Sequence, residues 1–276
     1  MVELAEKYHV DQTDLDGWKI AVNLTRGDRR LTNPDLRFYA EKLAAQAVLQ
    51  KAAKLVGPMR AATHTVREPL REPYAGELDV ETTLDNILGK PYPEPGDWVS
   101  SHREERRHEV VLMVDTSLSM QGENMAIAAV AAAVLALKLR PEDLAIVAFE
   151  EHASSITSLG VKDYPPEVVR RMLDQPVRGY TNIEEALELG AEEIERGRNP
   201  RRAGLLITDG VATAGGDPRP LAHRFPKLFV LLTEDYKMNP ELCRELADSA
   251  HGDVFPVRSF RHLPSRLLTV ANRLLR

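Results

Sequence analysis

The chain has 276 residues, and its 36 lysines and arginines against 42 aspartates and glutamates give a formal net charge of −6. With 28% charged and 43% hydrophobic residues, the composition is that of a globular protein and excludes a largely disordered or membrane-embedded one. No long basic run is present, which argues against a nucleic-acid partner, and the single cysteine, Cys243, excludes an intrachain disulfide and a cysteine-based zinc finger.

Targeting signals are not evident at the N-terminus. Glu3, Glu6 and Lys7 interrupt the first ten residues, so these residues lack the apolar core of a secretion signal. The longest apolar run, residues 125–137, is shorter than the roughly 20 residues that span a bilayer. We therefore expect a cytoplasmic protein that does not contact a membrane.

The first third of the chain differs in pattern from the rest. Asn33 and Pro34 suit the start of a helix that would run to Gly57. Prolines then break the sequence as far as Trp98, which predicts an irregular region with one or two helical turns around residues 80–88. A charge run at residues 103–107 is typical of a solvated linker, so we place a domain boundary there: an N-terminal helical and irregular extension over residues 1–107, and a second domain over residues 108–276.

The second domain shows apolar strands that alternate with helices. The strands read as continuous apolar runs, which is typical of strands buried on both faces of a parallel sheet. We expect strands at residues 110–114, 144–149, 154–159, 204–208, 228–232 and 254–257, and helices at residues 125–137, 168–173, 182–195, 240–250 and 264–275. The predicted fold is therefore α/β, a Rossmann-like and mostly parallel sheet covered by helices on both faces, with an N-terminal and partly helical extension.

Oxygen-bearing side chains follow two of these strands. Asp115, Ser117 and Ser119 alternate directly after the first strand, and Asp209 follows the strand at residues 204–208. In parallel sheets, ligands bind outside the carboxyl ends of the strands, so these side chains belong to one edge. Carboxylate and hydroxyl oxygens suit Mg²⁺, Mn²⁺ or Ca²⁺ rather than zinc.

This pattern resembles the metal-ion-dependent adhesion site of von Willebrand factor A (VWA) domains. In that family a Thr from a later loop and an Asp from a later strand end complete the site; residues 178–183, with Thr181, and residues 205–210, with Asp209, look like those two loops. The resemblance covers residues 109–276, with one departure at Leu118, where many members carry Gly. It implies a Mg²⁺ site, with Mn²⁺ or Ca²⁺ possible, formed by Asp115, Ser117, Ser119, Thr181 and Asp209.

Each of these residues also has a purely structural interpretation. Asp115 and Thr181 could cap the helices that follow them, and Asp209 could close an ordinary Asp-Gly turn. The five positions together, in order and on a matching topology, favour the metal site. Cys243 lies within a predicted helix, and we expect it to be a packed, unreactive thiol.

Residues 76–84, upstream of the predicted sheet, resemble the segment that precedes the A domain in CoxE-like proteins. That resemblance implies work beside a MoxR-type AAA+ ATPase, in maturation of another protein or in metal insertion. Because the chain has no Walker-type phosphate loop, the ATPase would be a separate chain.

A metal held by one carboxylate and two hydroxyls, with Thr181 and Asp209 acting through water, would keep a coordination position for a ligand from a protein partner. We expect this ligand to be a Glu or Asp carboxylate, and the protein to be a binding module rather than an enzyme. Two alternatives stay open: a Mg²⁺-dependent phosphohydrolase and a metal-free structural adaptor. The first is disfavoured because Ser117 stands where a second Asp would serve as acid and base.

Overall fold

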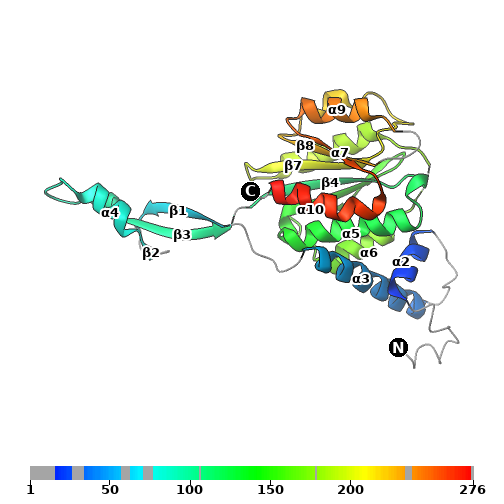
Figure 1. The fold of residues 1–276 in the computed structure, drawn as a ribbon, viewed down its shortest axis with the longest axis horizontal. Helices are drawn as coiled ribbons and strands as arrows, with labels where there is room; N and C mark the ends of the chain where they lie inside the picture. Colours follow the sequence, from blue (N-terminus) through cyan, green and yellow to red (C-terminus); the bar gives the residue numbers. More distant parts are fainter. Residues whose placement is uncertain are drawn as a thin grey trace. The chain divides into compact units, whose positions relative to one another are not determined.

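The structure is a computed structural model, and it describes residues 16–26, 34–56, 63–70, 77–105, 107–177, 179–233 and 238–274. These residues belong to two compact units (Figure 1). Of the described residues, 16–26, 34–56 and 108–274 with its gaps belong to the large unit, and residues 63–70, 77–105 and 107 belong to the small unit.

A six-stranded sheet with the order β6-β5-β4-β7-β8-β9 forms the centre of the large unit. All neighbouring strands are parallel except β5 and β6, which form an antiparallel edge hairpin. The strands are β4 (Glu109–Asp115), β5 (Leu144–Phe149), β6 (Ala153–Thr157), β7 (Arg202–Thr208), β8 (Leu228–Thr233) and β9 (Val254–Val257). Every residue of β5 and β8 is buried, which explains why these strands read as unbroken apolar runs.

Helices cover both faces of this sheet (Figure 1). One apolar cluster joins the sheet to α5 (Glu123–Lys138), α6 (Pro165–Leu173) and α10 (Leu263–Leu274). A second cluster on the other face includes α7 (Ile183–Arg196), α8 (Arg219–Ala222) and α9 (Pro240–Ser249). The predicted fold class, a mostly parallel sheet between two helical layers, is confirmed.

Helices from the N-terminal part of the chain add a further layer to the first face. The short helix α2 (Gly17–Thr25) and the long helix α3 (Pro34–Val56) belong to the same apolar cluster as α5. The alanine-rich α5 is buried on nearly every side as a result, because it packs between the sheet and these helices. The division at residues 107 and 108 stays a prediction, and the packing adds α2 and α3 to the unit that contains the sheet. Within the described residues, no helix has the length and apolarity needed to cross a bilayer.

The small unit is an antiparallel sheet with the order β1-β3-β2 and one helix. It contains β1 (Thr63–Pro69), β2 (Glu77–Leu78), α4 (Val80–Ile87) and β3 (Val99–Glu105). The predicted helical turns correspond to α4, but the region around them is not irregular as expected, because β1 and β2 also lie in it. Prolines stand at the end of β1 and in the connection from α4 to β3, and the charges at residues 103–105 belong to a paired strand rather than to a linker.

Candidate metal site

The candidate site lies at the carboxyl edge of the two central strands of the large unit. In the parallel register of β4 and β7, Val114 stands opposite Ile207. Asp115 is the last residue of β4, and Asp209 directly follows Thr208, the last residue of β7. The topology therefore brings both carboxylates to one sheet edge, as the sequence predicts.

The loop after β4 folds around the Asp115 carboxylate. The backbone N–H of Ser117 donates a hydrogen bond of 2.8 Å to Asp115 Oδ1, and the side chains of both residues are buried. Thr116 is tied to the neighbouring strand, since its N–H and hydroxyl both donate to the carbonyl of Phe149. A short 3₁₀ turn, Leu118–Met120, then leads to Gly122, whose φ of +80° suits a residue without a side chain. Ser119 lies within this turn, and its side chain is outside the described residues.

Thr181 sits in the loop that enters α7, and it is buried. Its backbone N–H donates to Thr213 Oγ1 at 2.8 Å, and the N–H of Thr213 donates back to the carbonyl of Thr181 at 2.9 Å. The helix cap is Asn182 and not Thr181, because the Asn182 side chain accepts the N–H of Glu185. The capping interpretation of Thr181 is therefore wrong, and its hydroxyl is left for another role.

Asp209 begins the loop that also carries Thr213. Its Oδ1 accepts the N–H of Val211 at 2.8 Å, and its backbone carbonyl accepts the N–H of Asn239 at 2.9 Å. Gly210 has a φ of +78°, and a Cβ there would collide with the Asn239 carbonyl and with Cys243 Sγ. The Asp209 and Thr181 loops are thus joined through Thr213, which sequence spacing gave no signal to identify.

The electrostatics of Asp115 favour a cation. Burial raises the pKa of the Asp115 carboxyl to about 7, hydrogen bonds from Ser117 oppose this shift, and the negative charge of Asp209 adds to it. No lysine or arginine among the described residues forms an ion pair with Asp115. A buried carboxylate beside a second one, without a positive partner, is costly unless a cation binds there.

The chemistry of the available donors indicates which cation fits. Within the part of the chain that the structure describes, no three His, Cys, Asp or Glu side chains gather into a metal cluster. A site at Asp115 therefore depends on hydroxyl groups in addition to carboxylates. Ser117 and Thr181 are buried hydroxyl residues in its loops, whereas the buried Thr116 hydroxyl donates to the Phe149 carbonyl. Such a donor set fits a hard divalent cation.

This sheet order and helical covering are those of von Willebrand factor A domains. A von Willebrand factor type A structure from Catenulispora acidiphila matches with a TM-score of 0.51 and 17% identity, over 64% of this chain and 45% of that one. Proximal thread matrix protein 1 from the mussel byssus, in a structure with a zinc-occupied MIDAS motif, matches with a TM-score of 0.52 and 20% identity, over 61% of this chain and 48% of that one. At these identities the likeness establishes the fold.

The family follows from the sequence comparison. Residues 52–230 match the family described as VWA domain containing CoxE-like protein, and the chain belongs to it. The uncharacterized protein YehP of Escherichia coli (strain K12) is 28% identical over 211 residues. That match covers 72% of this chain and 53% of YehP, so the chain spans about half the length of this relative.

Proposed function

We propose that the large unit is a protein-binding module that depends on a divalent cation, and that it is not an enzyme. The observation that carries this proposal is the buried Asp115 carboxylate, which lies near Asp209 and lacks a cationic partner among the described residues. Asp115, Ser117 and Ser119 would hold the ion, and Thr181 and Asp209 would support it from the neighbouring loops. The bound cation would supply a coordination position for a Glu or Asp carboxylate of the partner.

Mg²⁺ is the proposed ion, with Mn²⁺ and Ca²⁺ as alternatives, because the donors are oxygen atoms only. The resemblance to CoxE-like proteins extends the proposal to the partner, a MoxR-type AAA+ ATPase in the cytoplasm, with a role in protein maturation or metal insertion. Exposed apolar side chains beside the proposed ligands support the binding of a protein partner. Leu118, in the loop that follows β4, is 59% exposed, and Tyr180, next to Thr181, is 58% exposed.

Metal binding is tested first, on the full chain, by thermal unfolding at pH 8 in EDTA and in Mg²⁺, Mn²⁺, Ca²⁺ or Zn²⁺. We expect Mg²⁺ to raise the melting temperature of the wild type, because ligands that bind only the folded state stabilise it. Asp115→Ala should lose this response, and in EDTA it should melt above the wild type because it removes a buried charge. Asp248→Ala, an exposed change on α9, is the matched control.

Partner binding is tested with the same variants. A purified MoxR-type ATPase should bind the wild type and Asp248→Ala in Mg²⁺ but not in EDTA, and Asp115→Ala in neither. A melting temperature unchanged by every ion would overturn the metal site and favour the metal-free adaptor. Hydrolysis of a phosphate ester that requires both Mg²⁺ and Asp115 would favour the phosphohydrolase instead.

A further inference from the structure

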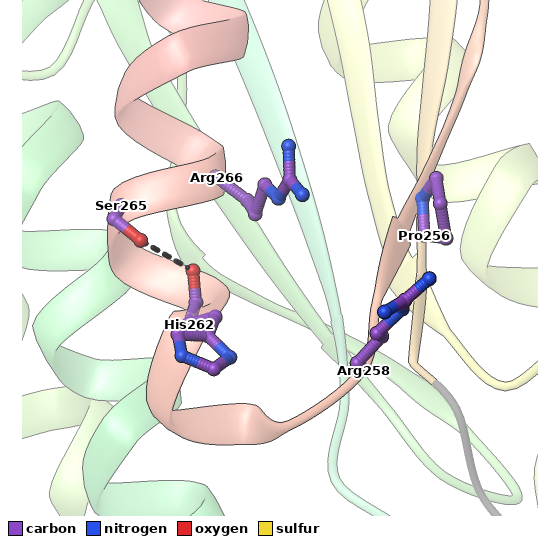
Figure 2. A pocket seen from close by; sticks show the side chains of 5 residues that line it. All are labelled: Pro256, Arg258, His262, Ser265 and Arg266. Atoms are coloured by element: carbon purple, nitrogen blue, oxygen red, sulfur yellow. Dashed lines mark hydrogen bonds between the residues drawn. The ribbon is translucent and has the colours of Figure 1, made fainter.

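A second feature of the large unit is a surface cavity of about 310 Å³ between the end of β9 and the first turn of α10. Figure 2 shows the residues that line it: Pro256, Arg258, His262, Ser265 and Arg266. No acidic side chain lines the cavity, and residues 254–276 contain no Asp or Glu. The wall of the cavity is therefore basic.

The two arginines of the cavity differ from other arginines of the same segment. Arg261 Nη2 lies 3.4 Å from Glu123 Oε1, and Arg273 Nη1 lies 3.5 Å from Asp253 Oδ2, so both arginines have carboxylate partners. Arg258 and Arg266 form no ion pair with any residue that the structure describes. Figure 2 shows Arg266 extending from α10 toward β9, and Arg258 lying along β9 beside Pro256. Two like charges that line one cavity repel each other unless an anion binds there.

We propose that this cavity binds a phosphate group. A guanidinium fork matches two oxygens of an anion, and two forks that line one cavity suit an anion with more oxygens and more charge than one carboxylate has. A phosphate monoester has three terminal oxygens and a charge of about −1.5 to −2 at pH 7. His262 and the N-terminal end of α10, a helix of 12 residues, add donors and positive potential on the same side.

The cavity would bind a phosphate group without acting on it chemically. Ser265 is the hydroxyl residue of the lining, and its Oγ donates a hydrogen bond to the His262 carbonyl at 2.9 Å, as Figure 2 shows. The cavity volume lies near the lower end of the range for small-molecule sites, about 300–1,000 Å³, which leaves room for a phosphate and a small attached group.

The test is a titration of the full chain with inorganic phosphate by calorimetry, in EDTA and at constant ionic strength. EDTA makes the result independent of the proposed metal site, so the two proposals fail or succeed separately. We expect saturable binding that Arg258→Gln and Arg266→Gln each weaken at least fivefold, with unchanged melting temperatures. Arg244→Gln, on the exposed side of α9, is the matched control and should bind phosphate as the wild type does.

Titrations with other anions identify the molecule that carries the phosphate group and test whether binding is specific for phosphate. Phosphoserine and adenosine monophosphate are compared, and tighter binding of one assigns the phosphate to a protein or to a nucleotide. Acetate at the same ionic strength should not bind measurably. The proposal is overturned if phosphate does not saturate, if acetate binds equally well, or if Arg244→Gln loses as much affinity as the two cavity variants.

Discussion

The large and the small unit differ in what fills their interiors. In the large unit, the strands β4, β5, β7 and β8 bury apolar side chains against helices on both faces. Among the described residues of the small unit, the buried positions are mostly polar: Thr83, Asp97 and Ser100 are buried, and Val99 is the apolar residue buried with them. An apolar core holds the large unit together, whereas hydrogen bonds hold the small unit together.

The exposed apolar side chains of the small unit complete this contrast. Its large hydrophobic residues with 41–86% of their surface exposed are Leu78, Val80, Leu84, Leu88, Tyr92 and Trp98. Polar contacts tie its elements together instead, including the ion pairs from Arg67 to Asp79 at 2.6 Å and from Lys90 to Asp97 at 2.5 Å. The two units should therefore respond to different substitutions: the large unit to those that remove buried volume, and the small unit to those that remove hydrogen bonds.

The largest expected effect is at Cys243, a buried thiol that tests whether water is excluded from the core of the large unit. Burial, and to a lesser extent the charge of Asp209, raises the pKa of this thiol from 9.0 to about 12. At pH 8 the thiolate fraction should be about a thousandfold lower than for a free cysteine, and the alkylation rate should fall by at least that factor. The rate should rise tenfold per pH unit until pH 12 is approached.

Iodoacetamide labelling of the folded chain in EDTA, followed by mass spectrometry, measures this rate. The denatured chain is the control and should react at the rate of an ordinary thiol. Fast labelling of the folded chain at pH 8 would mean that water reaches the space between α9 and the sheet.

Leu112 and Leu84 provide a direct comparison of the two interiors. Leu112 in β4 is fully buried, so Leu112→Ala should lower the free energy of unfolding of the large unit by about 2–5 kcal/mol. Leu84 in α4 is 54% exposed, and Leu84→Ala should change stability by no more than about 0.5 kcal/mol. Urea unfolding followed by far-UV circular dichroism measures both. Equal losses for the two variants would refute the contrast.

Thr83 tests the hydrogen-bonded unit. Its Oγ1 accepts the N–H of Val99 at 3.1 Å and donates to the carbonyl of Val99 at 3.4 Å, which links α4 to β3. Thr83→Val keeps the shape but removes the partner that the Val99 N–H has in Thr83, at a cost of about 1–3 kcal/mol. The Val99 carbonyl still accepts the N–H of Asp79 at 2.8 Å, so the loss comes mainly from the N–H. Hydrogen exchange should speed up in the small unit alone, and Thr65→Val, an exposed change on β1, should have no such effect. Faster exchange in β4 would show that the two units unfold together.

The sequence predicts the large unit well because its strands are buried on both faces. Residues 110–114 and 228–232 need no alternation to be recognised as strands, since only apolar side chains fit between two helical layers. The expected apolar helix at residues 125–137 is observed as α5 at Glu123–Lys138 for the same reason. The sequence alone also brings Asp115 and Asp209 to one edge of the sheet, because both follow strands that run in the same direction.

The remainder could not be read from local patterns. Residues that pair between β1 and β3 lie 30 or more positions apart in the sequence, and their charged side chains hide the period of two that a half-buried strand would show. The tie between Thr181 and Thr213 is likewise a tertiary contact between two loops. The sequence of α5 is apolar on every side, which predicts that the helix is buried but does not tell which elements cover it. The packing of α2 and α3 on α5 therefore could not be predicted. Whether the five predicted residues bind a metal stays a prediction.

Two hydrogen bonds link the end of α2 to the loop that follows Asp115. Thr25, the last residue of α2, donates from Oγ1 to the carbonyl of Gly122 at 2.8 Å, and Gln121 Nε2 donates to the carbonyl of Arg26 at 3.3 Å. These contacts connect α2 directly to the loop that follows Asp115, independently of the sheet. A fragment that starts at His108 would lose them and would expose the apolar surface of α5 that α2 and α3 cover, so residues 16–26 and 34–56 belong in any transplant of the domain.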